Sequence, residues 1–317
     1  MKMIFVLMAV MLACVPAFSA EYIGIVSPAG SVNKEKIEAA ITFLESHDYK
    51  VKLGASVFAE EGYLAGTDQQ RADDINAMFA DEDVKMILCT RGGYGAARIL
   101  GLLDYAMIAR NPKPLIGYSD ITALHIVLGE KCGFTTIHGP MVSSLTSSNL
   151  ATPYTLDNFF RGMNGEYPSG EIPMPEGKKL EAVIPGRAEG VIRGGNLTLI
   201  ASLVGTPYEL KGDGALLLLE EIGEKPYRID RMLNQLLQNG LFNRVNGILL
   251  GDFLNCEADT EGTFSLDDVL KHYAELSGKP VIRGVPAGHG KHNLFLPMGV
   301  NARMEAREDG SAMLELD

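Results

Sequence analysis

A serine stands where an apolar run meets a helical pattern. Residues 114–123 read Pro-Leu-Ile-Gly-Tyr-Ser-Asp-Ile-Thr-Ala, which predicts a buried strand ending at Tyr118 and a helix beginning within two residues of Ser119. A serine at such a turn presents its hydroxyl above the sheet edge, beside helix N-terminal amides that can hold an oxyanion. The alternative is that Ser119 or Asp120 only caps the helix. The sequence Gly-x-Ser-Asp differs from the Gly-x-Ser-x-Gly elbow, so it does not predict an α/β-hydrolase fold.

A glycine-rich segment, Arg91-Gly-Gly-Tyr-Gly-Ala-Ala-Arg98, lies between another predicted strand and helix. Adjacent glycines let backbone amides approach a ligand closely. A nucleotide site is the alternative, but the segment lacks the third glycine of the dinucleotide fingerprint and the acidic residue about twenty positions on. A P-loop is also absent, because Gly290-Lys291 is followed by His292. We interpret the segment as a second oxyanion donor that faces Ser119.

Two later segments supply a carboxylate and an imidazole. The apolar run Leu216–Leu219 ends at Glu220 and Glu221, which point to opposite faces of a strand, so only one of them can face a pocket. The alternative for this pair is solvated charge at a strand end. His289 stands between two glycines just past a predicted strand, and histidine titrates near the working pH of a general base. His289 and His292 lack a matching carboxylate motif for a metal, so we expect no metal site.

The serine, the carboxylate and the histidine together make a nucleophile, an orienting group and a base, in the chain order Ser, Glu, His. In such a relay the base removes the hydroxyl proton, and the carboxylate fixes the tautomer and stabilises the imidazolium. The hypothesis therefore requires three distant segments to meet in the fold.

Alternating strands and helices must position these groups. The first part of the chain predicts a doubly wound parallel sheet that ends near residue 145. Its expected strands are 22–26, 51–53, 84–89 and 115–118, and its expected helices are 34–47, 67–79, 94–103 and 121–128. Residues 146–180 are rich in Ser, Thr, Asn, Pro and Gly, which predicts a linker with one short helix at 155–163.

The second part of the chain, residues 181–317, is richer in predicted strands. Its expected strands are 215–219, 247–251, 281–285, 300–306 and 313–316, and its expected helices are 197–204 and those following Pro226 and Ser265. The predicted fold is therefore α/β, with a parallel-sheet domain followed by a smaller, more β-rich α/β domain that is not its copy.

Charge and cysteine content exclude several classes of function. The net charge is −12 and no basic stripe is visible, which argues against a nucleic-acid partner. Once a leader containing Cys14 is set aside, Cys89, Cys132 and Cys256 cannot all pair, and their spacing fits neither a disulfide scaffold nor a zinc knuckle. We assign the cysteines no chemistry.

Residues 1–20 have the layout of a secretory signal. A lysine at position 2 precedes the apolar run Ile4–Ala13, and small residues lead to Glu21. The run is too short to span a bilayer as a retained helix. We expect export, with cleavage after Ala20 and a periplasmic location. The alternatives are a lipid anchor on Cys14 and a buried first element.

Six ordered motifs resemble those of the LD-carboxypeptidases, also called muramoyltetrapeptide carboxypeptidases. The resemblance runs from about Ile23 to the C-terminus. The motifs are Arg91-Gly-Gly-Tyr-Gly-Ala-Ala-Arg98, Gly117-Tyr-Ser-Asp120, Gly194-Gly-Asn-Leu197, Leu203-Val-Gly-Thr-Pro207, Leu219-Glu-Glu-Ile-Gly-Glu-Lys-Pro-Tyr-Arg228 and Gly288-His289.

The resemblance implies a serine peptidase without metal or cofactor that releases the terminal D-alanine of murein tetrapeptides. It also implies a flavodoxin-like first domain and a homodimer. The catalytic residues carried over are Ser119, Glu220 and His289, and the backbone amides of the oxyanion hole are those of Gly93 and Asp120. Relatives often have aspartate at the position of Glu221, which favours Glu220 as the relay carboxylate.

Two departures from the family bear on the substrate. Arg193 precedes Gly-Gly-Asn where relatives often have tryptophan, and murein-recycling members work in the cytoplasm, whereas this chain begins with an apparent export signal. An acidic substrate needs a cationic anchor, for which Arg193, Arg187 and Lys291 are candidates by their proximity to the motifs.

Two other functions stay open. One is a related peptidase that cleaves peptide–nucleotide antibiotic conjugates and confers self-immunity. The other is an exported solute-binding protein, although such receptors usually have two similar lobes and the β-rich second half argues against that class.

Overall fold

The computed structural model describes residues 21–145, 152–258 and 262–317. The expected leader, with Cys14, and the start of the expected linker lie outside the described residues. Within the described parts, no helix is both long enough and apolar enough to cross a membrane.

The first sheet has the strand order β12-β5-β4-β3-β1-β2. Its strands are β1 (Tyr22–Val26), β2 (Lys50–Leu53), β3 (Val84–Cys89), β4 (Leu115–Gly117), β5 (Thr136–His138) and β12 (Leu296–Met298). Strands β1 to β5 are parallel, and β12 runs antiparallel to β5. The parallel strands therefore follow the order 2-1-3-4-5, which is the flavodoxin-like arrangement. This confirms the predicted fold class.

Helices cover both faces of this sheet, as a doubly wound fold requires. On one face α1 (Lys34–Glu45) and α5 (Pro153–Met163) share a core with β1, and on the other lie α2 (Asp68–Ala80), α3 (Tyr105–Arg110) and α4 (Thr122–Val127). The predicted capping box opens α2, because Gln70 N–H donates to Thr67 Oγ1 and Thr67 N–H donates to Gln70 Oε1. The helix expected at 94–103 is a 3₁₀ helix over Ala96–Leu102, here labelled η1.

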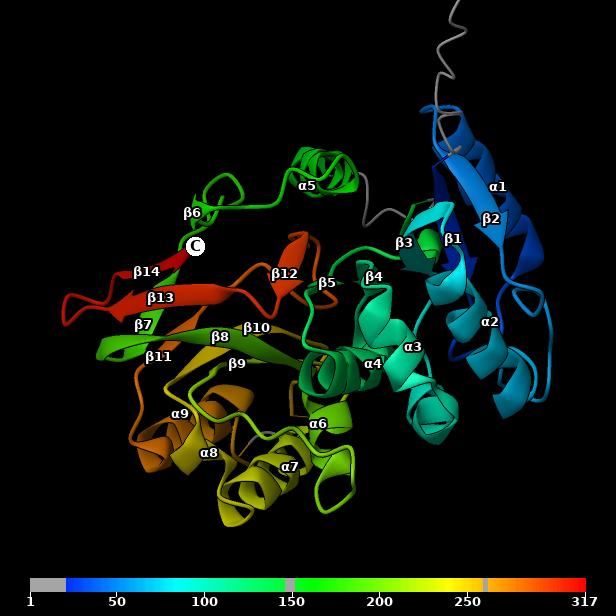
Figure 1. Ribbon diagram of the computed structural model, residues 1–317. Helices are drawn as coiled ribbons and strands as arrows, with labels where there is room; N and C mark the ends of the chain where they lie inside the picture. Colours follow the sequence, from blue (N-terminus) through cyan, green and yellow to red (C-terminus); the bar gives the residue numbers. More distant parts are fainter. Residues whose placement is uncertain (1–20, 146–151, 259–261) are drawn as a thin grey trace, which may run out of the picture.

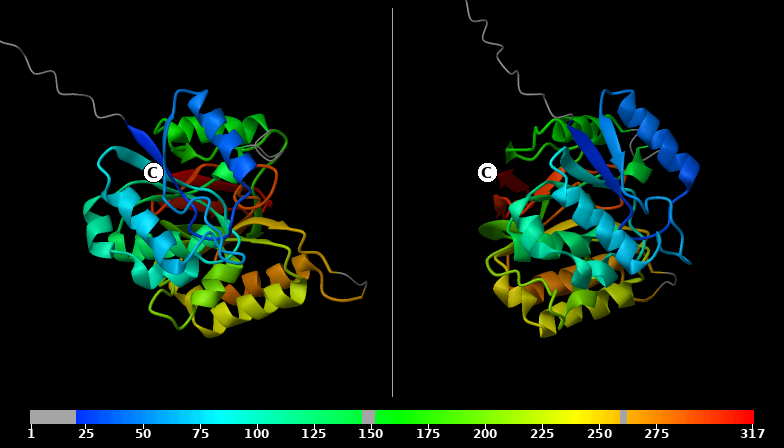
Figure 2. Two further views of the ribbon diagram at one scale, coloured as in Figure 1. Left: turned by 90° about the vertical axis from the view of Figure 1, so that its right-hand side faces the viewer. Right: turned by 45° about the vertical axis from the view of Figure 1, so that its right-hand side comes forward.

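The second sheet has the order β6-β14-β13-β8-β9-β10-β11-β7. Its central strands are parallel: β8 (Gly186–Asn196), β9 (Leu216–Ile222), β10 (Gly247–Leu254) and β11 (Val281–Arg283). The flanking strands are antiparallel: β6 (Gly170–Glu171), β7 (Glu181–Ile184), β13 (Asn301–Ala306) and β14 (Ala312–Leu316). Helices α6 (Leu197–Leu203), α7 (Pro226–Gln238), α8 (Leu241–Arg244) and α9 (Leu266–Ser277) cover one face, with α7 and α9 side by side (Figures 1 and 2).

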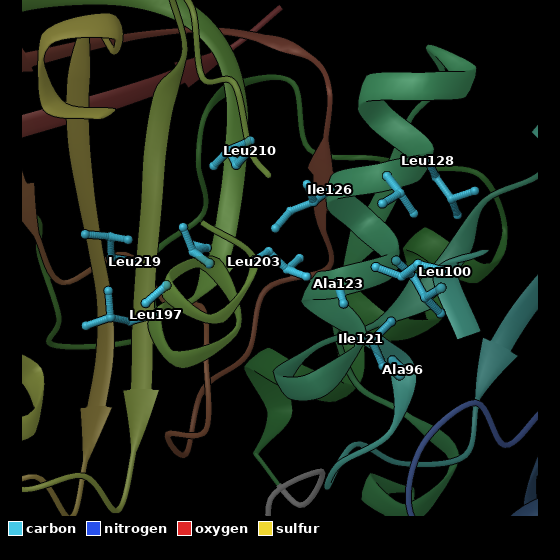
Figure 3. Close-up of a cluster of buried hydrophobic side chains, with 14 of the residues drawn as sticks. Ala96, Leu100, Ile121, Ala123, Ile126, Leu128, Leu197, Leu203, Leu210 and Leu219 are labelled. Atoms are coloured by element: carbon cyan, nitrogen blue, oxygen red, sulfur yellow. The ribbon is translucent and has the colours of Figure 1, made fainter. Parts of the chain in front are cut away.

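A continuous apolar cluster joins the two sheets. Ala123 and Ile126 of α4 face Leu197, Leu203 and Leu219 across the junction (Figure 3). All five side chains are buried, and complete burial of a leucine or isoleucine stabilises the fold by about 1.5–3 kcal/mol. Because α4 follows the serine turn and Leu219 precedes the glutamate pair, this packing sets the distance between those two parts of the site.

Candidate active site

The serine turn has the strained backbone expected of a nucleophile. Strand β4 ends at Gly117, Tyr118 is extended, and Ser119 adopts a φ of 63°. A positive φ is uncommon outside glycine and costs about 1–3 kcal/mol. Ser119 is half-buried at the carboxyl edge of the first sheet, followed at once by a short 3₁₀ helix over Ser119–Ile121 that leads into α4.

The glycine-rich loop packs directly on this serine. A Cβ atom built on Gly92 would lie 2.9 Å from Ser119 Cβ, 3.0 Å from Ser119 Oγ and 3.2 Å from Asp120 N. The space next to the hydroxyl and the Asp120 amide is therefore open only because residue 92 is glycine. The first amides of a helical turn have no partner within the turn, so the Asp120 N–H can donate into this space. Gly93, the second expected donor, follows Gly92 on the loop.

The Asp120 side chain ties the loop to the turn. Its Oδ2 accepts a hydrogen bond from Ala96 N–H at 2.8 Å. Burial raises the pKa of Asp120 to about 6, against the opposing effects of the Ala96 amide and of Arg71. Arg71 is itself fully buried and donates to the carbonyl oxygens of Pro28 and Gly95. These contacts fix the glycine-rich loop to the serine turn and to the loop after β1.

Filling the space at Gly92 should abolish most of the activity without unfolding the chain. Gly92 has no positive φ, and the atoms nearest to the methyl group of Gly92→Ala are Ser119 Cβ and Oγ and Asp120 N. We expect a fall in kcat of about 10²- to 10³-fold, the effect of losing an oxyanion donor. Gly101→Ala, whose added methyl meets only the flexible end of Tyr208, is the matched control. Equal activity of the two variants in a turnover assay would contradict this placement of the oxyanion hole.

Glu220 and His289 are in direct contact. Glu220 is fully buried on β9, and His289 Nδ1 lies 2.7 Å from its Oε2. Burial raises the pKa of Glu220, and the hydrogen bond from His289 opposes this shift. When Nδ1–H donates to the carboxylate, Nε2 carries the free lone pair that a general base needs.

His289 reaches the serine turn from the second sheet. Its ring packs edge-on against Tyr118, with the centroids 4.9 Å apart, and Tyr118 is the residue before Ser119. The described residues include no hydrogen bond between Ser119 and His289. Two members of the predicted triad, Glu220 and His289, are therefore in contact, and Ser119 is next in sequence to Tyr118, on which His289 packs. Catalytic hydrogen bonds often tighten only when substrate binds.

Glu221 points the other way and has a structural set of contacts. Its carboxylate accepts hydrogen bonds from Asn196 Nδ2, from the amide and hydroxyl of Thr198, and from its own neighbour Ile222 N–H. Glu221 thus satisfies the N-terminus of α6. Strand alternation, left open by the sequence alone, places Glu220 and not Glu221 beside His289.

Asp252 belongs to the site and was missed in the sequence. Its Oδ2 accepts a hydrogen bond from Gly290 N–H at 3.0 Å, and its own N–H donates to Ala287 O at 2.9 Å. These two bonds bracket the loop that carries His289. The signal that could have found it is the one that singled out Glu220, since Asp252 is also an acid at the end of an apolar strand run.

Asp252 should make stability depend on pH. Burial raises its pKa to about 6, so the native state keeps a proton that the unfolded chain has already lost near pH 4. The contribution of Asp252 to the unfolding free energy is therefore fully present below about pH 4 and is lost as the pH rises through about 6. We expect Asp252→Asn to gain up to about 3 kcal/mol of unfolding free energy relative to wild type between pH 4 and pH 7 in urea unfolding. A difference in unfolding free energy between Asp252→Asn and wild type that did not change with pH would contradict this prediction.

The three cationic candidates are placed differently from one another. Arg187 is highly exposed and is ion-paired with Glu305. It lies nine residues before Asn196, where β8 ends at the site, which is about 30 Å along the strand. Arg193 reaches Gly129, beyond the C-terminal end of α4 and away from Ser119. Both expectations are therefore corrected. Lys291 is exposed two residues after His289 and stays next to the site.

Other titratable groups near the site are not placed for catalysis or metal binding. His138 is fully buried beside Tyr118, and burial, with the neighbouring His125 and His289, lowers its pKa to about 3, which keeps the ring neutral. In the described segments, no group of three or more His, Cys, Asp or Glu side chains is placed to hold a metal ion.

Family models match both halves of the chain. The model described as the LD-carboxypeptidase N-terminal domain matches residues 23–139, and that described as the LD-carboxypeptidase C-terminal domain matches residues 189–304. The chain is 39% identical over 290 residues to a probable murein peptide carboxypeptidase of Bacillus subtilis, covering 90% of this chain and 89% of the relative. It is 34% identical over 295 residues to a murein tetrapeptide carboxypeptidase of Pseudomonas aeruginosa, covering 89% and 92%.

Solved structures agree with the fold. A muramoyltetrapeptide carboxypeptidase from Oxalobacter formigenes superimposes with a TM-score of 0.81 at 30% identity, covering 93% of this chain and 99% of that one. The microcin C7 self-immunity protein MccF superimposes with a TM-score of 0.82 at 24% identity, covering 94% and 96%, which shows a shared fold. With both domain models matched and relatives above 30% identity along most of its length, the chain belongs to the LD-carboxypeptidase family of serine peptidases.

Proposed function

We propose that this enzyme hydrolyses the peptide bond that releases the terminal D-alanine of murein tetrapeptides, with Ser119 as nucleophile. The observation that carries the proposal is the 2.7 Å contact between His289 Nδ1 and the buried Glu220, in which the His289 ring also packs on Tyr118 of the serine turn. The names of the relatives supply the substrate class, because a murein tetrapeptide carboxypeptidase matches along most of both chains.

The geometry supports a two-step acyl transfer. Ser119 Oγ attacks the scissile carbonyl carbon while His289 Nε2 takes the hydroxyl proton, and Glu220 stabilises the imidazolium. The oxyanion accepts hydrogen bonds from Gly93 and Asp120 N–H. His289 then gives the proton to the nitrogen of D-alanine, the C–N bond breaks, and an acyl-enzyme remains. A water molecule, deprotonated by His289, attacks that ester and releases the tripeptide and Ser119.

A panel of defined muropeptides tests this function. Purified enzyme should convert tetrapeptide to tripeptide with release of D-alanine and leave tripeptide unchanged. The same assay with a peptidyl sulfamoyl adenylate as substrate distinguishes the murein peptidase from the second candidate, a peptidase of peptide–nucleotide conjugates. The fold shared with the self-immunity protein favours testing it. Turnover of the adenylate alone would overturn the murein proposal, and tight binding without any turnover would favour the solute-binding alternative.

Export and dimerisation are further parts of the proposal. Residues 1–20 carry the sequence pattern of a secretory signal, and an exported copy would meet murein directly in the periplasm. The family resemblance supports a homodimer. N-terminal sequencing of the protein from cell fractions and light scattering of the purified enzyme test these two statements, with a protein beginning at Glu21 and twice the monomer mass as the expected results.

A further inference from the structure

Within the described part of the chain, one arginine next to the proposed oxyanion hole forms no ion pair. Arg91 follows β3, is exposed, and belongs to the glycine-rich loop. Its Nε donates to Gly92 O at 3.2 Å and its Nη1 donates to Ser31 O at 3.3 Å. Across the described segments no carboxylate forms an ion pair with it, so the guanidinium is held by two backbone carbonyls while its charge is left uncompensated.

The place of this guanidinium in the fold is one where ligands bind. The loops after β1 and β3 hold Ser31 and Arg91, and the strand order of the first sheet reverses between these two strands. In open α/β sheets, ligands bind at the carboxyl ends of the strands at this switch point. Gly30 N–H donates to Gly92 O, so the two loops are joined there.

The distance from the Arg91 guanidinium to the Gly93 amide suits a peptide whose terminal carboxylate binds the arginine. A Cβ atom built on Gly93 would lie 3.5 Å from Arg91 Nη2, so bond lengths place Nη2 no more than about 6.5 Å from Gly93 N. The terminal carboxylate carbon of a peptide lies roughly 3.5 Å from the carbonyl carbon of its last peptide bond. A substrate whose oxyanion meets the Gly93 amide therefore has its carboxylate within reach of Arg91.

We propose that Arg91 binds the α-carboxylate of the C-terminal residue and so makes the enzyme select peptides with a free C-terminus. This rests on the proposed carboxypeptidase function. A guanidinium offers two parallel N–H donors that match a carboxylate, and such a charged pair is stronger than a neutral hydrogen bond. Arg187 and Arg193 lie away from the serine, so of the three cations expected from the sequence the one that competes with Arg91 is Lys291, two residues after His289.

Paired substrates test the assignment. Kinetics are measured on a tetrapeptide ending in D-alanine and on the same peptide ending in D-alaninamide, with the tripeptide product followed in both cases. We expect Arg91→Gln to lower kcat/KM for the acid by about 10- to 100-fold, the range for a hydrogen bond to a charged group, and for the amide by less than about 3-fold. Arg91→Lys should recover part of the selectivity, and Arg187→Gln is the matched control that should behave as wild type.

Each outcome has a distinct meaning. Equal losses on both peptides would show that Arg91 only supports the loop through Ser31 and Gly92, which overturns the anchor alone. Loss of acid selectivity in Lys291→Gln with retention in Arg91→Gln would also overturn it. If the wild-type enzyme releases tripeptide from neither peptide, the carboxypeptidase function falls, and the anchor with it.

Discussion

Replacement of Ser119 by alanine should lower kcat for D-alanine release by about 10⁴- to 10⁶-fold while the chain stays folded. Only the hydroxyl group is removed, and the backbone hydrogen bond from Ile121 N–H to Tyr118 O across the turn is unaffected. Such a loss corresponds to about 5–8 kcal/mol of transition-state stabilisation. Tripeptide formation followed by chromatography, with circular dichroism on the same samples, makes the measurement.

Ser202→Ala is the matched control for this experiment. Ser202 is exposed on α6, where its hydroxyl donates only to the carbonyl of Leu199. Its replacement should change turnover by no more than a factor of two. Turnover by Ser119→Ala that persists after further purification, and so does not come from a contaminating enzyme, would contradict both the serine mechanism and the placement of the oxyanion hole.

Replacement of Glu220 by glutamine should lower kcat by about 10³- to 10⁴-fold. Glutamine keeps the volume but cannot stabilise the imidazolium that forms when His289 takes the serine proton. Because burial raises the pKa of Glu220, a charged carboxylate is costly there, and the neutral amide should leave the melting temperature unchanged or raise it. Steady-state kinetics and thermal unfolding on one preparation measure both effects.

Glu221→Gln gives the opposite result and serves as the paired control. The carboxylate of Glu221 accepts three hydrogen bonds from Asn196 and Thr198 at the start of α6 and one from Ile222 N–H on its own strand. Replacing it weakens a buried, charge-assisted network, so we expect a loss of about 1–3 kcal/mol of unfolding free energy. Its kcat should stay within about 10-fold of wild type. If instead Glu221→Gln is inactive and Glu220→Gln is active, the assignment of the relay carboxylate is reversed.

Four strands of the first sheet, β1 to β4, were predictable because their signals are local. The apolar runs at 22–26 and 84–89 match β1 and β3, and Thr67 with Gln70 marked the start of α2. Strands β5, β6, β7, β8 and β12 were not predicted. Strand β8 is glycine-rich and lies half-exposed along much of its length, so its hydrophobic alternation is weak, and its pairing with β9 and β13 is a tertiary effect.

The residues of the site likewise divide into those that a local sequence feature predicted and those that it did not. Each catalytic residue type stood at a recognisable local feature, since Ser119 follows an apolar strand, Glu220 ends another and His289 stands between glycines. The cations were predicted poorly because proximity to a motif in sequence does not say where a long side chain reaches. Arg193 is next to Gly194-Gly-Asn in the chain, yet its guanidinium reaches Gly129 at the far end of α4.

The sequence by itself determined the chemistry on offer, namely a hydroxyl, an imidazole and a carboxylate at the ends of predicted strands, because strand ends and turns follow from neighbouring residues. Only the tertiary structure decided which of Glu220 and Glu221 meets His289, that Asp252 holds the histidine loop, and that the Arg91 guanidinium donates to the carbonyl of Ser31. These choices depend on strand register and on packing between residues more than thirty positions apart, and no local pattern encodes either.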